Sequence, residues 1–287
     1  MLKPISFTTT GQKTLIADLT IYRFLPSRYA DAVGPFVLLD HFPPGHADPK
    51  EPRKTKGTGA HPHRGIATLT YLIQGEGEHH DSRGHHATIR SGGAQWMKAG
   101  NGIIHDEVIN ADAGTGDLLI HGFQFWINLP SKIKAELPEY LSLQAKDIPV
   151  KKLGEGAGWI KIIVGDYEEL SSKIPNYSRQ FLYHIHLLPG ATFSLPTDAT
   201  MEYAALLPTR AAMINTTTYQ TGEFIEFGKD EGTIEINNKS ELATDIILFG
   251  GEPYTESIIA RGPFVMNSDL EIAQAYKDFH AGKYGII

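Results

Sequence analysis

The chain has 287 residues, which is long enough for two domains of about 130 to 150 residues each. Its composition, 41% hydrophobic and 21% charged, suits an ordinary globular protein, and the lack of cysteine excludes disulfides, thiolate nucleophiles and iron–sulfur clusters. The formal net charge of −7 without a basic run argues against direct nucleic-acid binding.

The chain begins with MLKPISFTTTGQKTLIADL, which has no basic region followed by an apolar stretch, so we expect no secretory signal. The sequence also has no apolar run of about 18 residues, so we expect no membrane span. The expected location is the cytoplasm, or also the nucleus if the cell is eukaryotic.

Short apolar or alternating segments dominate the chain and are separated by turn signals such as DSRG and KDEG. This close spacing favours β-sandwiches or barrels over βαβ units. The segments that we expect to form strands are FVLLDHF, ATLTYLIQ, ATIRS, LLIHGFQFWINL, WIKIIVG, FLYHIHLLPG, EFIEFG, TIEIN and DIILFGG.

The boundary between the two domains is expected near the middle of the chain. Residues 128–150 are richer in Pro and Lys and less strand-like than their surroundings. We place the crossover there, which gives an N-terminal domain over residues 1–135 and a C-terminal domain over residues 136–287.

A helix is expected near the C-terminus. Ser268 and Glu271 form an S-x-x-E capping box, and Gly282 can end the helix. Ile272, Tyr276 and Phe279 fall on one face, so this helix should dock against a sheet.

Two histidine-containing pairs are candidate metal ligands. Side chains two residues apart in a strand point to the same face, so His61 and His63 should project together, and so should His105 and Glu107. Facing strands would bring together three imidazoles and one carboxylate, a set that suits Fe(II), Mn, Ni, Cu or Zn. The alternative is an accidental pairing of the kind that surface strands often show.

The remaining histidines are expected to play other roles. Asp106 should face away from the metal, because it lies between His105 and Glu107. The residues around the DSRG turn should be solvated, with one at most at the pocket mouth, and the YHIHL pair should be hydrogen-bonded strand residues. His121 should be a core residue or one that supports the ligands. The turn and strand histidines meant here are His79, His80, His85, His86, His184 and His186.

Four stretches resemble the pirin family, whose members are two-domain proteins of the cupin superfamily. They are GPFVLLDHF, HPHRGIATLTYLIQGEGEHHDS, QWMKAGNGIIHDE and GPFVMNSDLEIAQAYKDFHAGKYG, and together they reach across most of the chain. The resemblance implies an all-β fold of two antiparallel β-barrel or jelly-roll cupin domains. It also implies one metal, usually iron, in the N-terminal domain and a metal-free C-terminal domain.

The ligands of the family carry over to His61, His63, His105 and Glu107, with Fe(II) as the expected metal. One departure is Ala67, which stands where pirins usually have Glu. Because the ligating carboxylate comes from the second motif, this change should spare the metal, but we expect it to alter the polarity of the pocket. A second departure, GGA in place of PGD at residues 92–94, concerns a turn.

The resemblance implies cleavage of a flavonol, or a similar enediol-like substrate, by O2 in the manner of quercetin 2,3-dioxygenase. Glu107 is then the candidate base for the flavonol 3-hydroxyl. Trp96, Met97 and Phe42 are candidate wall residues or plain core, and Arg64 supports the ligands or forms a structural ion pair.

Pirins are also linked to regulation through protein partners. The alternative function is therefore an iron-containing, redox-responsive interaction protein without robust turnover. A cupin with isomerase or hydrolase chemistry is a third possibility. The negative charge favours a protein partner over DNA, but no motif in the sequence names that partner.

Overall fold

The computed structural model describes residues 1–16 and 19–287. The chain divides into two compact units, neither of them continuous in sequence. Unit 1 comprises Met1–Gln12, Arg23–Pro35 and Ile148–Tyr254, and unit 2 comprises Lys13–Tyr22, Phe36–Asp147 and Thr255–Ile287. The domain boundary expected between residues 135 and 136 stays a prediction. A single boundary does not account for the N-terminal segments of unit 1 or for the C-terminal segment of unit 2.

Unit 2 is built on two antiparallel sheets. Their strand orders are β12-β9-β6-β11-β4-β3-β2 and β5-β10-β7-β8. Ile21, Phe42 and Leu72 of the larger sheet pack against Ile89 of the smaller one, so the two sheets share a core. The strands are β2 (Gln12–Ile16), β3 (Leu19–Leu25), β4 (Phe36–His46), β5 (His61–His63), β6 (Ile66–Gln74), β7 (Glu76–Asp81), β8 (His86–Ile89), β9 (Ala94–Lys98), β10 (Ile103–Asn110), β11 (Leu119–Asn128) and β12 (Glu139–Leu143).

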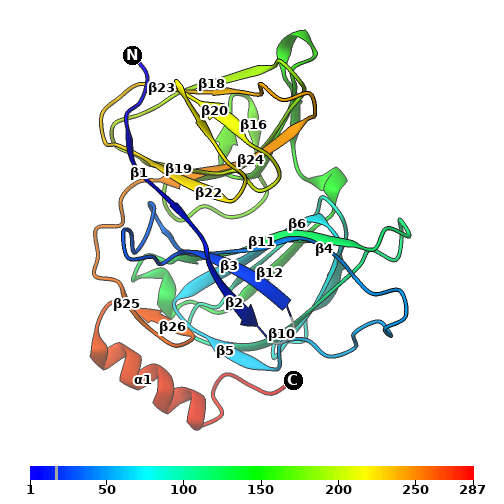
Figure 1. The fold of residues 1–287 in the computed structure, drawn as a ribbon. Coiled ribbons are helices and arrows are strands. Elements are labelled where there is room, and N and C mark those ends of the chain that lie inside the picture. Colours follow the sequence, from blue (N-terminus) through cyan, green and yellow to red (C-terminus); the bar gives the residue numbers. More distant parts are fainter. Residues whose placement is uncertain (17–18) are drawn as a thin grey trace. The chain divides into compact units, whose positions relative to one another are not determined.

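The C-terminal part of unit 2 is a β-hairpin followed by a helix, shown in orange and red in Figure 1. Strands β25 (Ile259–Arg261) and β26 (Phe264–Met266) precede α1 (Asp269–His280). The side chain of Ser268 accepts a hydrogen bond from the backbone N–H of Glu271, so the predicted cap is confirmed. The buried face of α1, with Ile272 and Ala275, packs on Phe264 and Met266. Ile272 and Phe279 of the predicted stripe belong to this contact, whereas Tyr276 is 37% exposed.

Unit 1 repeats the two-sheet arrangement. Its strand orders are β1-β22-β19-β24-β17-β14-β13 and β18-β23-β20-β21. The strands are β1 (Ile5–Thr10), β13 (Val150–Lys152), β14 (Gly158–Val164), β15 (Asp166–Tyr167), β16 (Leu170–Ser171), β17 (Gln180–Leu187), β18 (Thr192–Pro196), β19 (Glu202–Leu206), β20 (Ala212–Ile214), β21 (Thr217–Tyr219), β22 (Glu223–Phe227), β23 (Thr233–Asn237) and β24 (Thr244–Gly251).

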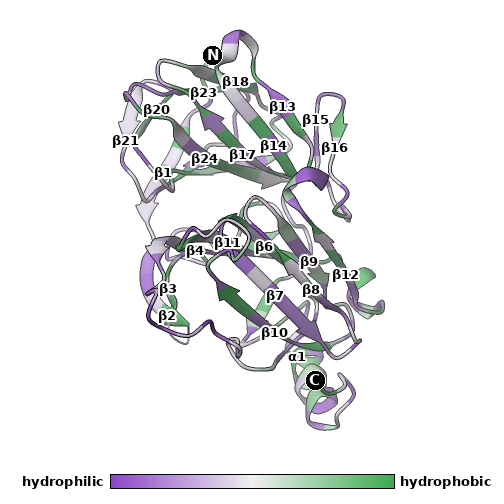
Figure 2. Cartoon of the chain, turned by 90° about the vertical axis from the view of Figure 1, so that its right-hand side faces the viewer, coloured by the Kyte–Doolittle hydropathy of each residue, from purple (hydrophilic) through white to green (hydrophobic). Residues whose placement is uncertain are grey.

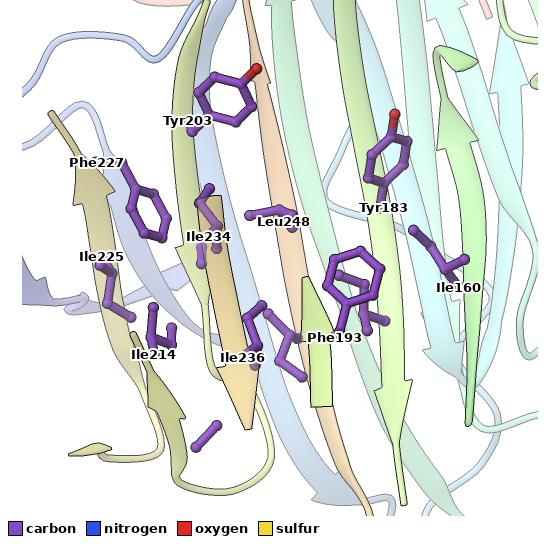
Figure 3. Close-up of a cluster of buried hydrophobic side chains, with 14 of the residues drawn as sticks. Ile160, Tyr183, Phe193, Tyr203, Ile214, Ile225, Phe227, Ile234, Ile236 and Leu248 are labelled. Atoms are coloured by element: carbon purple, nitrogen blue, oxygen red, sulfur yellow. The ribbon is translucent and has the colours of Figure 1, made fainter. Parts of the chain in front are cut away.

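The space between the sheets of unit 1 is filled by apolar side chains from both of them (Figure 3). Phe193, Ile214 and Ile236 from the smaller sheet meet Tyr183 and Leu248 from the larger one. The expected absence of a metal from the C-terminal domain stays a prediction.

The all-β class with one short C-terminal helix is confirmed. The named strand pairs are antiparallel, and the described sheets stack as open jelly-roll layers rather than closing into barrels. In the described part of the chain, no helix is long and apolar enough to cross a membrane.

Candidate metal centre

Strand register brings the candidate ligands of unit 2 together. Strand β5 pairs with β10, and His61 lies opposite His105. On its other side β10 pairs with β7, where Glu107 lies opposite His79. The central strand of this three-stranded arrangement therefore carries two of the four predicted ligands.

The three histidines form a compact cluster. The ring centroid of His105 lies 4.5 Å from that of His61 and 5.0 Å from that of His63. One ring nitrogen from each residue falls within 4.8 Å of the other two. His63 and His105 are buried, and His61 is half-buried.

Hydrogen bonds to carbonyl groups orient two of these rings. Nδ1 of His63 lies 2.9 Å from the carbonyl oxygen of Pro263, and Nδ1 of His61 lies 2.8 Å from that of Gly59. A carbonyl can only accept, so each Nδ1 carries the proton and each Nε2 keeps its lone pair. This is the tautomer that a metal ligand needs.

Burial keeps two of the imidazoles neutral. It lowers the pKa of His63 and of His105 well below the ordinary value, and the neighbouring histidines lower both further. Neutral imidazole is the form that binds metals.

The ring nitrogens of the three histidines are not satisfied by hydrogen bonds to one another. Nε2 of His105 faces Nε2 of His61 at 3.1 Å. Within the described chain, the buried Nδ1 of His105 has no hydrogen-bond partner. Because buried polar atoms are normally paired, three converging imidazoles with an orphaned nitrogen suit a bound divalent metal. This cluster can hold such an ion.

Glu107 is held beside the cluster by a cradle of polar side chains. Its Oε1 accepts hydrogen bonds from Thr70 and Gln95, and its Oε2 accepts one from Gln124 at 2.7 Å. Tyr140 donates to Oε1 of Gln95, which directs the amide nitrogen of Gln95 towards Glu107. No motif in the sequence points to Thr70, Gln95 or Gln124.

His79 is not the solvated turn residue that we expected. It is 1% exposed, and with His105 and Glu107 it forms a second group whose potential ligand atoms lie within 4.8 Å. Glu107 therefore shares a group with His105 and His79, and the group of His61, His63 and His105 does not include it. Neighbours in a strand face opposite sides, and on β7 the inward side belongs to His79 rather than His80.

The imidazole of His79 is fixed by two contacts. Its Nε2 lies 3.1 Å from a carboxylate oxygen of Asp81, and its ring stacks on Tyr140 with centroids 4.2 Å apart. Burial alone would raise the pKa of Asp81, but hydrogen bonds from His79, His85 and two backbone N–H groups hold it well below its usual range. The carboxylate therefore stays ionised and orients His79.

Known proteins resemble this chain both in sequence and in fold. The family model described as Pirin matches residues 19–127, and the Pirin C-terminal cupin domain matches residues 182–285. A Pseudomonas aeruginosa protein named "Putative quercetin 2,3-dioxygenase" is 34% identical over 258 residues, which is 88% of this chain and 87% of that protein. This chain belongs to the pirin family.

Other pirins and solved structures agree. A tomato pirin-like protein is 36% identical, over 88% of this chain and 82% of its own. The crystal structure of a quercetin 2,3-dioxygenase from Acinetobacter baumannii superposes with a TM-score of 0.91 at 30% identity and covers 99% of both chains. The resemblance read from the sequence is thus confirmed.

The pirin site is reached by small cavities in unit 2. Two of them, about 50 and 30 Å³ in volume, touch Glu107. Phe42 lines the first, in line with its predicted place on the wall. A larger groove of about 750 Å³ shares Leu19, Lys54 and Ile109 with these cavities. The groove and the inner cavities at Glu107 are therefore neighbours.

Ala67 does not face the site of this pirin, which corrects our expectation about pocket polarity. Thr70 contacts Glu107, and Thr68 lies opposite Trp126, whose ring packs on His63 with centroids 4.9 Å apart. Ala67 has the other parity on β6, so its side chain projects from the opposite face of the sheet. On β9, the side chain of Met97 lies on the same face of the sheet as that of Gln95, and the side chain of Trp96 lies on the opposite face.

Arg64 of this pirin forms the structural ion pair that was one of two expectations. Its Nη1 lies 2.8 Å from a carboxylate oxygen of Asp278 and 3.4 Å from the hydroxyl of Tyr284. It therefore ties the ligand strand to α1.

Four histidines outside the cluster contact a carboxylate or each other. His184 and His186 both contact Oδ1 of Asp245, which confirms that they are hydrogen-bonded strand residues. His121 is buried, with its Nε2 3.0 Å from that of His41. Asp106 accepts hydrogen bonds from the backbone of Gly57 and Gly59, so its carboxylate is turned to that loop.

Proposed function

We propose that this pirin is a metal-dependent dioxygenase that cleaves a flavonol, or a similar enediol-like substrate, with O2. The convergence of three imidazoles, two of them oriented by backbone carbonyls, beside a hydrogen-bonded carboxylate is the observation that carries the proposal. Relatives that are named quercetin 2,3-dioxygenases at 30% identity or more support the choice of substrate class.

His61, His63, His105 and Glu107 would hold the metal, with Fe(II) as the proposed ion. When bound, the metal supplies Lewis-acid and one-electron chemistry. His63 and His61 contribute their Nε2 lone pairs, since their Nδ1 protons are engaged by Pro263 and Gly59.

Glu107 would accept the proton of the substrate hydroxyl. An ionised carboxylate offers about four acceptor positions, and three of those on Glu107 are occupied by Thr70, Gln95 and Gln124. One position is left for a metal or a proton. The two glutamine amides fix the direction of that position, and positioning of this kind is what general-base catalysis needs.

The groove beside Leu19, Lys54 and Ile109 would admit the substrate. Its volume of about 750 Å³ lies within the range of small-molecule sites. Apolar side chains such as Ile16, Leu19 and Phe42 line the inner cavity and would exclude water around the reacting atoms.

The proposal is tested by anaerobic reconstitution with Fe(II), followed by addition of quercetin and O2. We expect O2 consumption and release of carbon monoxide faster than with free Fe(II). Glu107→Gln should lower kcat at least 100-fold, the scale of a lost general base. Asp106→Asn is the matched control and should keep activity within tenfold at equal iron content.

Turnover no faster than that of free Fe(II) would overturn the proposal. The redox-responsive interaction protein, the isomerase or hydrolase chemistry and the cytoplasmic location stay predictions.

A further inference from the structure

A second group of ligand-type side chains lies on the outer face of the β7–β8 hairpin. Strand β7 alternates, so that Gly77, His79 and Asp81 are buried while Glu78 and His80 are accessible. Figure 2 shows β7 coloured largely as hydrophilic. Across the hairpin, His86 is the direct partner of His80.

The three accessible side chains converge. Nε2 of His80 lies 3.0 Å from Oε1 of Glu78, and Nε2 of His86 lies 2.8 Å from the same oxygen. The two imidazole rings have centroids 3.6 Å apart. One potential ligand atom from each residue lies within 4.8 Å of the other two.

This group is separate from the centre described above. The pleat of β7 sends His79 to one side, towards His105, and His80 to the other. The side chains of His80, His86 and Glu78 are 45%, 57% and 31% exposed, so ions in solution can reach them.

The surroundings favour a cation. Asp106 of β10 lies opposite His80 and adds a second carboxylate to the same face, where its oxygens accept hydrogen bonds from the backbone of Gly57 and Gly59 and are not among the proposed ligands. In the absence of a cation, two imidazoles share one carboxylate oxygen as their acceptor. Exposed contacts of this kind contribute little to stability, so exchanging them for ligand bonds costs little.

We propose that Glu78, His80 and His86 form a second, surface metal site that binds a borderline divalent cation such as Zn²⁺. Two imidazole nitrogens and one carboxylate oxygen are preferred Zn²⁺ ligands, and a three-residue set leaves a position for water or a further ligand. Binding through Nε2 requires the tautomer with the proton on Nδ1, which replaces the contacts of each Nε2 with Glu78. The site does not depend on the proposed dioxygenase activity.

The test uses the full-length, untagged protein after removal of metals. In the His61→Ala/His105→Ala variant, which lacks two ligands of the buried centre, we expect one equivalent of Zn²⁺ to bind in competition with a chromophoric chelator. Further replacement by His80→Ala and His86→Ala should weaken that binding at least 100-fold. Adding His280→Ala instead should leave it unchanged.

Two further measurements keep the test independent of how the combined variants fold. The His80→Ala/His86→Ala protein, with the buried centre intact, should bind one equivalent fewer than wild type. Cu²⁺ in the His61→Ala/His105→Ala variant should show nitrogen couplings from two imidazoles in its electron paramagnetic resonance spectrum. Equal Zn²⁺ stoichiometry in wild type and His80→Ala/His86→Ala would overturn the proposal.

Discussion

Nδ1 of His63 donates a hydrogen bond to the carbonyl oxygen of Pro263, which lies 200 residues later in the chain, over a distance of 2.9 Å. Neighbouring contacts reinforce this link, because the N–H of Val265 donates to the carbonyl of Arg64. Gly65 has φ of +84°, and a Cβ there would lie 2.0 Å from the carbonyl oxygen of Val265. Glycine therefore permits the β25–β26 hairpin to approach the ligand strand.

Shortening Phe264 should weaken both this link and the fold. The side chain is fully buried between β26 and α1, and Phe→Ala in a core costs about 3 to 5 kcal/mol. We expect Phe264→Ala to lower the free energy of unfolding by that amount in urea titrations. Metal affinity should fall about 10- to 100-fold, as happens when the partner of a ligating histidine is displaced.

Leu270→Ala, on the exposed face of the same helix, is the control for Phe264→Ala. Leu270 is 81% exposed, so its replacement should change stability by no more than about 0.5 kcal/mol. Unchanged metal affinity in Phe264→Ala would mean that the hairpin does not position His63.

Either Glu107 or His79 can be the fourth ligand beside the three histidines, and the Fe(II) affinities of variants at these positions distinguish the two assignments. We expect Glu107→Ala to weaken Fe(II) binding more than 100-fold, and His79→Gln to weaken it no more than about tenfold, the lower end for groups that support a ligand. Equilibrium dialysis with iron analysis measures both. The reverse order would identify His79 as a ligand and Glu107 as a purely catalytic or structural group.

Leu19 lines the larger groove and both inner cavities, so we expect it to control access to Glu107. Leu19→Trp should narrow the route, lowering kcat/KM for quercetin at least tenfold while iron content stays at the wild-type level. Leu118→Trp, a residue that lines the groove but neither inner cavity, is the matched control. Similar kinetics for the two variants would argue against this route.

Asp278 should make the attachment of α1 sensitive to acid. Hydrogen bonds from Lys283 and Arg64 lower the pKa of Asp278 to about 2, from 3.8. Because the folded-state pKa is the lower one, its stabilising contribution is complete above about pH 4 and is lost as the pH falls towards 2. Asp278→Asn should therefore be less stable than wild type at pH 6, and the difference should shrink towards pH 2.

Urea titrations across this pH range measure the effect of Asp278→Asn, with Asp31→Asn, at an exposed position of unit 1, as the control. A stability difference that stays constant between pH 6 and pH 2 would contradict the assigned pKa.

The sequence predicted the fold class and the capped helix, because these depend on local patterns, whereas the gathering of the histidines also needed facing strands. The i, i+2 rule placed His61 and His63 on one face, and the observed register does bring His105 to them. The same rule could not tell which of His79 and His80 faces inward, since that depends on the pairing of β7 with β10.

The cradle of Glu107 was missed for a related reason. Thr70, Gln95 and Gln124 come from three different strands, and no short motif joins them. The error about Ala67 arose because the strand parity was not extended from His63 through the turn at Gly65. Assigning the face of Ala67 from that of Thr70 would have required knowing beforehand that Thr70 contacts Glu107.

The link between His63 and Pro263 also sets an order of events during synthesis. When the first 150 residues of the nascent chain have emerged from the ribosome, they already include His61, His63, His105 and Glu107. They lack the carbonyl that fixes the tautomer of His63, because Pro263 has not yet been made. The buried centre of this pirin therefore reaches its final geometry only after Pro263 has been made and has folded back onto His63.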